Sequence, residues 1–133
     1  MSSPTPGVSD RRRILVVDDE VVLRSLIARG FRERGYEVVE MADGLSALDA
    51  ARSTSIPFSL VVTNHRMPHL NGPNLAACLR ELDPTLPIIH VSGNHGTRHE
   101  ILPPGVPTLF KPFSIWDLLD EGGKMIQERE QAT

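Results

Sequence analysis

Short apolar runs alternate with helical patterns along most of the chain. Ile14–Val17 is continuously apolar, and Leu60–Thr63 is apolar until its last residue, which is typical of strands buried on both faces of a sheet. Three further runs have the length and composition of strands. The pattern therefore predicts five strands, at Ile14–Val17, Glu37–Met41, Leu60–Thr63, Pro87–Val91 and Val106–Phe110.

Apolar residues at helical spacing separate these strands. In the four predicted helices they are Val22, Leu26 and Phe31; Leu45, Leu48 and Ala51; Leu75, Cys78, Leu79 and Leu82; and Ile115, Leu118, Leu119, Met125 and Ile126. Gly35 ends the first helix, Pro84 and Pro87 close the third, and the last is predicted over Ile115–Glu128. This alternation predicts an α/β fold with a doubly wound parallel sheet and helices on both faces.

The segment between the fourth and fifth strands departs from the regular alternation. Residues Thr97 to Glu100 resemble a capping box that opens a helix. Pro103-Pro104 must stop that helix within about two turns. We therefore expect the fourth helix, between these two strands, to be shortened or missing.

Composition and charge indicate a globular protein with one hydrophobic core. The 133 residues are 40% hydrophobic and 23% charged, and the formal charge of −3 gives no reason to expect nucleic acid as a partner. No apolar run approaches the roughly 20 residues that cross a bilayer. The single cysteine, Cys78, cannot form an internal disulfide, so we expect a cytoplasmic protein without membrane contact.

The chain is interpreted as a single domain between two tails. We expect a flexible N-terminal tail at residues 1–12, the domain at 13–129 and a C-terminal tail at 130–133. The chain ends too early to hold a second, DNA-binding domain, so we expect a stand-alone domain whose output comes from its own surface.

Polar side chains follow four of the predicted strands. Asp18 and Asp19 come after the first strand, Asn64 after the third, Ser92 after the fourth and Lys111 after the fifth. In open parallel sheets the functional crevice lies outside the carboxyl ends of the strands. The sequence therefore predicts one site at this edge of the sheet.

Four local patterns around these residues resemble those of response-regulator receiver domains, the CheY-like proteins of two-component signalling. The patterns are Leu15-Val16-Val17-Asp18-Asp19, Asn64-His65-Arg66-Met67-Pro68 with Asn71-Gly72 behind it, Val91-Ser92-Gly93 and Lys111-Pro112-Phe113. They occur in the family's order and near its spacing, and the resemblance covers about Arg13 to Arg129. It implies the flavodoxin-like receiver fold, with strand order 2-1-3-4-5.

The resemblance also implies roles for the residues at the strand ends. Asp18 and Asp19 match the acids that hold Mg²⁺, together with the backbone carbonyl of Arg66. Ser92 matches the hydroxyl that contacts the phosphoryl group. Lys111 matches the lysine that pairs with the phosphoacceptor carboxylate and then with the phosphoryl oxygens.

Asn64 occupies the position at which the family carries its phosphoacceptor aspartate. A carboxamide has no anionic oxygen to attack phosphorus, so no acyl phosphate is expected there. The loss of one negative charge leaves Mg²⁺ binding possible but weakened. We expect Lys111 either to donate to the Asn64 carbonyl oxygen or to turn to Asp18.

Three explanations of Asn64 stay open. The chain is a natural pseudo-receiver, or it is an ordinary phosphate-accepting receiver with an engineered aspartate-to-asparagine change, or a neighbouring side chain accepts phosphate instead. We favour the first because other positions also depart from the family. The third ranks last, since no neighbour matches the in-line geometry of phosphoryl transfer; the neighbours are Thr63, His65 and Ser92.

One such departure is Thr108, which stands where receivers usually carry an aromatic ring. In the family, that ring swings inward when the hydroxyl residue of the site moves. In the family, the fourth helix, fifth strand and fifth helix form the main partner-binding face. With the helix shortened and the ring absent, the resemblance implies a remodelled face.

The histidines and the single tryptophan are interpreted as structural residues. His90 lies within a strand and is expected to be buried and hydrogen-bonded, whereas His65 and His69 lie on a loop, where solvated histidines are commoner. His95 and His99 have the spacing of a helical metal pair but no third ligand in view. Trp116 either packs against Phe113, which we favour, or is exposed as an anchor for a partner.

The leading hypothesis is a receiver-like domain that acts in two-component signalling through protein–protein contacts. A histidine kinase, a phosphotransfer protein or a downstream regulator would be its partner. We do not expect an enzyme, because neither G-x-G-x-x-G nor G-x-x-x-x-G-K-[ST] occurs. A small nucleotide- or flavin-binding enzyme is the alternative from another class, and a thermal-shift screen with those ligands tests it.

Overall fold

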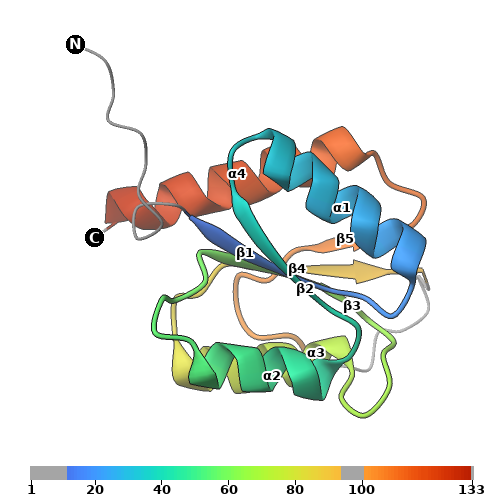
Figure 1. Ribbon diagram of the computed structural model, residues 1–133. Helices are drawn as coiled ribbons and strands as arrows, with labels where there is room; N and C mark the ends of the chain where they lie inside the picture. Colours follow the sequence, from blue (N-terminus) through green and yellow to red (C-terminus); the bar gives the residue numbers. More distant parts are fainter. Residues whose placement is uncertain (1–11, 94–100, 133) are drawn as a thin grey trace.

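The structure, a computed structural model, describes residues 12–93 and 101–132. Its elements are β1 (Arg13–Val17), α1 (Val21–Glu33), β2 (Glu37–Met41), α2 (Gly44–Ser53), β3 (Leu60–Asn64), α3 (Gly72–Leu82), β4 (Ile88–Ser92), β5 (Thr108–Phe110) and α4 (Ile115–Ala132). Neighbouring strands all pair in parallel, in the order β2-β1-β3-β4-β5 (Figure 1). The predicted doubly wound sheet and its strand order are confirmed.

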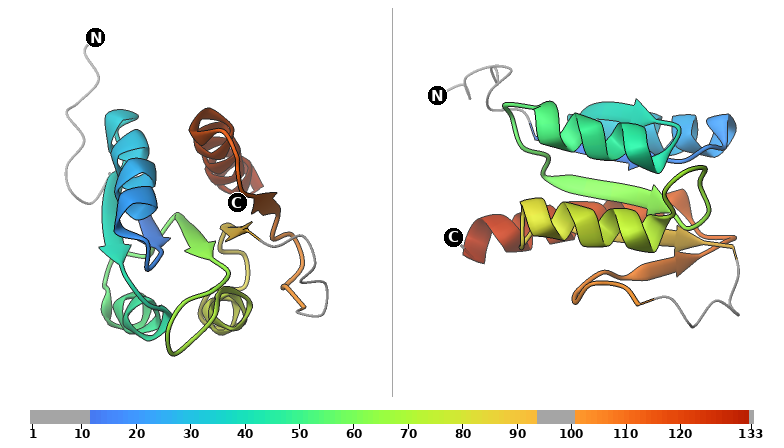
Figure 2. Two further views of the ribbon diagram at one scale, coloured as in Figure 1. Left: turned by 90° about the vertical axis from the view of Figure 1, so that its right-hand side faces the viewer. Right: turned by 90° about the horizontal axis from the view of Figure 1, so that it is seen from below.

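Two helices cover each face of the sheet: α1 and α4 pack together on one face, and α2 and α3 on the other (Figure 2). Alternate residues of β1 enter the two cores. Ile14 and Val16 belong to the core under α1 and α4, and Leu15 and Val17 to the core under α2 and α3. These four side chains are at most 1% exposed. Burial on both faces is the reason why this strand is continuously apolar.

The start of α3 lies against the end of β3. The Asn71 side chain caps the helix by accepting a hydrogen bond of 2.9 Å from the backbone N–H of Asn74. The backbone N–H of Gly72 donates to the His65 carbonyl oxygen over 2.8 Å. A Cβ atom at Gly72 would overlap the carbonyl oxygen of Asn64, so this approach of helix to strand requires glycine.

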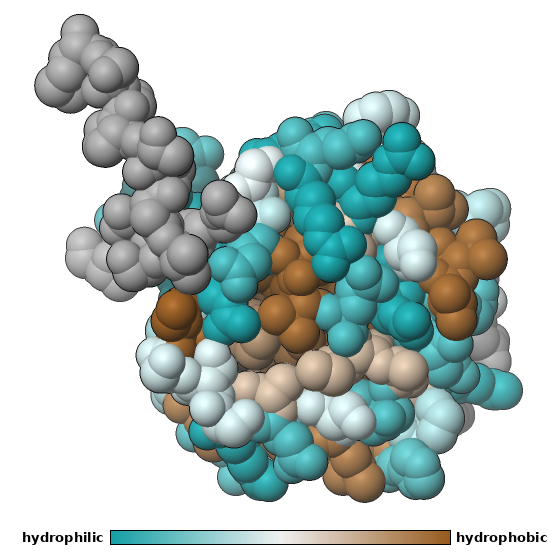
Figure 3. Space-filling view, in the orientation of Figure 1, coloured by the Kyte–Doolittle hydropathy of each residue, from teal (hydrophilic) through white to brown (hydrophobic). Residues whose placement is uncertain are grey.

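Several apolar residues of the predicted helix stripes face solvent. Val22 and Leu26 are 74% and 49% exposed, whereas Ile27 and Phe31 of the same helix are at most 1% exposed. Figure 3 shows apolar surface on its right-hand side, where α1 begins. Leu45 and Leu82 are also about half exposed. Their assignment to the core was wrong, because α1, α2 and α3 each bury a narrower stripe than their apolar residues span.

Trp116, at the start of α4, is 68% exposed. The prediction that it is packed was therefore wrong. The inward-facing residues predicted for this helix are confirmed: Leu118, Leu119 and Ile126 are buried, and Ile115 and Met125 pack against the same core. Helix α4 continues to Ala132, four residues beyond the predicted end at Glu128. Within residues 12–93 and 101–132, the helices lack the combined length and apolar character needed to cross a bilayer.

The connection from β4 to β5 is irregular where the structure describes it. Ile101–Pro107 forms no helix, in agreement with the expected loss or shortening at the two prolines. The Arg80 guanidinium of α3 holds this segment by donating to the Pro104 carbonyl oxygen over 2.7 Å, while its Nε donates to Leu86 over 2.8 Å. The predicted capping box, with His95 and His99, lies outside the described residues.

Candidate functional site

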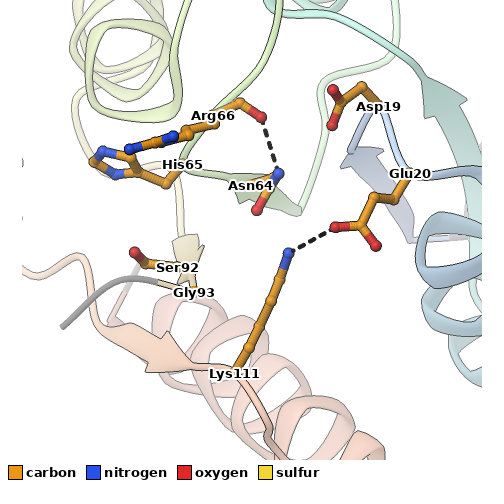
Figure 4. Close-up of a pocket in the computed structure, with 8 residues that line it drawn as sticks. All are labelled: Asp19, Glu20, Asn64, His65, Arg66, Ser92, Gly93 and Lys111. Carbon is orange, nitrogen blue, oxygen red and sulfur yellow. Dashed lines mark hydrogen bonds and ion pairs between the residues drawn. The ribbon is translucent and has the colours of Figure 1, made fainter.

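A cavity of about 440 Å³ opens at the carboxyl ends of the strands, where the sequence predicts a site. It is lined by Asp19, Glu20, Asn64, His65, Arg66, Ser92, Gly93 and Lys111 (Figure 4). The loop after β1, the end of β3, the end of β4 and the residue after β5 all contribute to it. The structure thus brings together side chains that are nearly a hundred positions apart in the chain.

Asp18 is not among the residues that line the cavity and is 2% exposed. Its carboxylate accepts a hydrogen bond of 2.9 Å from the backbone N–H of Glu20, and its carbonyl oxygen accepts one of 2.8 Å from Arg24. Burial raises the pKa of the Asp18 carboxyl, although the Glu20 N–H and the nearby Lys111 ammonium oppose the shift. Asp19, by contrast, lines the open cavity.

Asn64 is the last residue of β3 and is 7% exposed. Its amide Nδ2 donates a hydrogen bond of 2.9 Å to the backbone carbonyl oxygen of Arg66 (Figure 4). An aspartate has no donor with which to make this contact when it is ionised. The carbonyl that the family resemblance assigns to a metal ion is therefore engaged by the amide.

Lys111 contacts Glu20 rather than the expected partners. Its Nζ lies 3.2 Å from the Glu20 carboxylate, and the two side chains are 26% and 61% exposed. The prediction that Lys111 turns to Asn64 or Asp18 was wrong. Glu20 was missed, although its sequence signal was present: it is the third acid in a row after β1.

One buried histidine, His65, lines the cavity, and a second, His90, contacts it. His65 is 6% exposed and His90 is 4% exposed, so the expectation of a solvated His65 was wrong and that of a buried His90 is confirmed. His65 Nδ1 lies 2.8 Å from His90 Nε2, and His90 Nδ1 lies 3.0 Å from Thr108 Oγ1. Burial, assisted by the neighbouring His65, lowers the pKa of His90 to about 4. His69 is exposed.

The oxygen atoms at the site are a poor fit to magnesium as they stand. Mg²⁺ requires near-octahedral oxygen ligands. One Asp18 oxygen and the Arg66 carbonyl already accept hydrogen bonds, and Asn64 offers a neutral oxygen in place of a carboxylate. Across residues 12–93 and 101–132, no cluster of three or more His, Cys, Asp or Glu side chains is arranged to hold a metal ion.

Comparisons with known proteins agree with the fold. Residues 14–121 match the family model of the response regulator receiver domain. The response regulator receiver protein CpdR of Brucella abortus is 32% identical over 118 residues, which cover 86% of this chain and 97% of CpdR. The transcriptional regulatory protein SphR of Synechococcus elongatus is 32% identical over 124 residues, 86% of this chain but only 48% of SphR.

A solved structure gives the same result. The receiver domain of the hybrid histidine kinase CckA is 36% identical, with a TM-score of 0.74 over 86% of this chain and 98% of that domain. The chain thus spans nearly all of CpdR and about half of SphR. Together with the parallel sheet and the polar cavity at its strand ends, these matches show that the chain belongs to the response-regulator receiver-domain family of two-component signalling.

Proposed function

We propose that this chain is a pseudo-receiver, which acts in two-component signalling through protein contacts and accepts no phosphoryl group. The observation that carries the proposal is the side chain of Asn64. It stands at the end of β3 inside the cavity and donates to the Arg66 carbonyl oxygen over 2.9 Å. In the receiver family this position supplies the attacking carboxylate.

The chemistry of the neighbouring groups supports a silent site. A carboxamide oxygen carries no full negative charge, so it is a poor nucleophile toward phosphorus. Lys111, which would balance the charge of a phosphoryl group, is paired with Glu20 at 3.2 Å. Ser92 contributes a hydroxyl to the cavity. The cavity therefore holds the binding groups of a receiver without its nucleophile.

Magnesium binding is proposed to be weak at this site. Asp18 and Asp19, with the Arg66 carbonyl, are the residues that would hold the ion. When bound, the ion would neutralise negative charge beside Asn64. The Asn64 amide competes for the Arg66 carbonyl oxygen, and the third carboxylate is absent, so the affinity falls below that of a receiver with aspartate.

The proposed partners are a histidine kinase, a phosphotransfer protein or a downstream regulator. Relatives that match this chain include a sensor kinase named CckA and the response regulator receiver protein CpdR. No enzymatic activity is proposed, because the nucleophile of the cavity is missing and the sequence carries no nucleotide-binding motif.

Exposure to a small phosphodonor, followed by intact-mass measurement, tests the proposal. We expect no added phosphate on the natural chain, and stable labelling of it would overturn the proposal. Peptide mapping of any label distinguishes Asn64 from Thr63, His65 and Ser92. Asn64→Asp is the informative variant, and Asn74→Asp, at an exposed position of α3, is the matched control.

The same experiment separates the two accounts of Asn64. If Asn64→Asp forms an acyl phosphate and the unsubstituted chain does not, the cavity lacks only the nucleophilic carboxylate. That result is expected of an ordinary receiver with an aspartate-to-asparagine change. A site that remains unlabelled in that variant has lost further function, as expected of a degenerate receiver. Either result leaves the chain with Asn64 silent, so labelling of that unsubstituted chain is the outcome that decides the proposal.

A further inference from the structure

Three polar side chains form a continuous hydrogen-bonded row from the edge strand to the cavity wall. Thr108 Oγ1 on β5 lies 3.0 Å from His90 Nδ1 on β4, and His90 Nε2 lies 2.8 Å from His65 Nδ1 in the loop after β3. Both imidazoles are buried, at 4% and 6% exposure. His65 also lines the cavity beside Asn64. The row therefore connects edge strand β5, through β4, to the loop that follows β3.

The chemistry of imidazole restricts how the protons can be placed in this row. A neutral imidazole has one N–H donor and one acceptor nitrogen. If the Thr108 hydroxyl donates to His90 Nδ1, then His90 carries its proton on Nε2 and donates to His65 Nδ1. His65 must then carry its own proton on Nε2. In the reverse arrangement, both rings carry the proton on Nδ1 and Thr108 accepts.

Each arrangement satisfies every contact in the row, and a mixed one does not. If the two rings held different tautomers, the nitrogens that meet at 2.8 Å would be two donors or two acceptors. At a buried site such a clash costs the free energy of unsatisfied polar groups. The low dielectric that makes the paired row favourable also makes its interruption expensive.

We propose that Thr108, His90 and His65 form a relay that couples edge strand β5 to the cavity wall, with both imidazoles changing tautomer together. A group that donates a hydrogen bond to His65 Nε2, in place of one that accepts from it, reverses the direction of both contacts. Thr108 then changes from donor to acceptor. The relay transmits this change while both rings stay neutral, and it requires no phosphoryl group in the cavity.

Long-range ¹⁵N–¹H NMR of the intact chain at pH 8 tests the relay directly. The ordinary imidazole pKa is about 6.5, so pH 8 favours the neutral rings. The nitrogen that bears the proton is distinguished from the other by its chemical shift. We expect His65 and His90 to hold the same tautomer, or the same ratio of tautomers. Different tautomers on the two rings would overturn the proposal.

A substitution at the far end provides a second, independent test. Thr108→Val removes the hydroxyl with little change of shape, and we expect the ring nitrogens of His65 to shift in the same direction as those of His90. Thr108→Ser, which keeps the hydroxyl, should retain the natural shifts. Thr85→Val, at an exposed threonine, is the control. An unchanged His65 in Thr108→Val would show that the coupling ends at His90 and would refute the relay.

Discussion

The side-chain amide of Asn64 and the backbone carbonyl of Arg66 are joined by a hydrogen bond of 2.9 Å. The two groups lie at the cavity edge where the receiver family binds a metal ion, and here they satisfy each other. A cation that uses the Arg66 oxygen must compete with this hydrogen bond. We therefore expect this hydrogen bond to lower the affinity of the site for a metal ion.

Replacing Asn64 with aspartate should strengthen Mg²⁺ binding by at least about tenfold, or about 1.4 kcal/mol. The change adds a carboxylate to the site and removes the donor that engages Arg66. Isothermal titration calorimetry of both proteins measures the difference. Asn74→Asp adds the same charge at an exposed position and should leave the affinity close to natural. Equal affinity in Asn64→Asp and the natural chain would contradict this account of the site.

Gly72→Ala should destabilise the fold by about 2 kcal/mol or more, since its Cβ would overlap the Asn64 carbonyl oxygen and crowd the backbone of His65. Gly93→Ala is the matched control because its Cβ would meet Lys111 at an ordinary 3.7 Å. That variant should stay within about 0.5 kcal/mol of the natural chain. Urea unfolding measures both. Similar stabilities would show that helix α3 can move away from β3 at little cost.

The stability of the fold should fall as the pH drops from about 6.5 to about 4, in part because of His90. Its folded pKa is lowered to about 4, whereas an unfolded histidine takes up its proton near 6.5. Between these values the unfolded chain binds more protons, so stability rises with pH there and is level above it. The contribution is at most about 3 kcal/mol.

Urea unfolding of the natural chain and of His90→Asn, over this pH range, isolates the histidine. Groups that do not contact His90 cancel, including Asp18, whose raised pKa acts in the opposite direction. We expect a shallower pH dependence in the variant. Direct NMR titration of His90 provides a check that does not depend on folding, and a midpoint near 6.5 would rule out the predicted contribution.

Glu20→Gln should change stability by no more than about 1 kcal/mol, although it removes the ion-pair partner of Lys111. Glu20 is 61% exposed in this 3.2 Å pair, and ion pairs of this kind contribute little in water. Glu33→Gln, which breaks the exposed pair with Arg29, is the comparison. A loss above about 2 kcal/mol for Glu20→Gln alone would show that the cavity depends on this pair for its structure.

The sheet and the convergence of its polar strand ends could be predicted from the sequence. Ile14–Val17 and Leu60–Val62 are apolar on both faces, which requires helices on both sides of the sheet. Parallel strands then bring their carboxyl ends to one edge, so Asp19, Asn64 and Lys111 had to meet there.

The sequence pattern could not predict every side-chain contact, nor how much of each helix is buried. Lys111 is long enough to reach several carboxylates, and only the backbone path after β1 brings Glu20 to it. Likewise, the buried His65 contacts His90, which lies 25 positions later in the chain. Trp116 and Leu26 are apolar residues that the helices leave on the surface. Periodicity identifies a stripe on a helix but not how much of it the rest of the fold covers.

The attachment of Pro104 to Arg80 has a consequence for how this edge of the molecule can vary. A helix is held in its conformation by hydrogen bonds between its own backbone amide and carbonyl groups. Ile101–Pro107 is instead held in part by a guanidinium on α3, which donates to the Pro104 carbonyl oxygen over 2.7 Å. A substitution at Arg80 would therefore remove this contact without changing any residue of the five-stranded sheet or of the cavity lining.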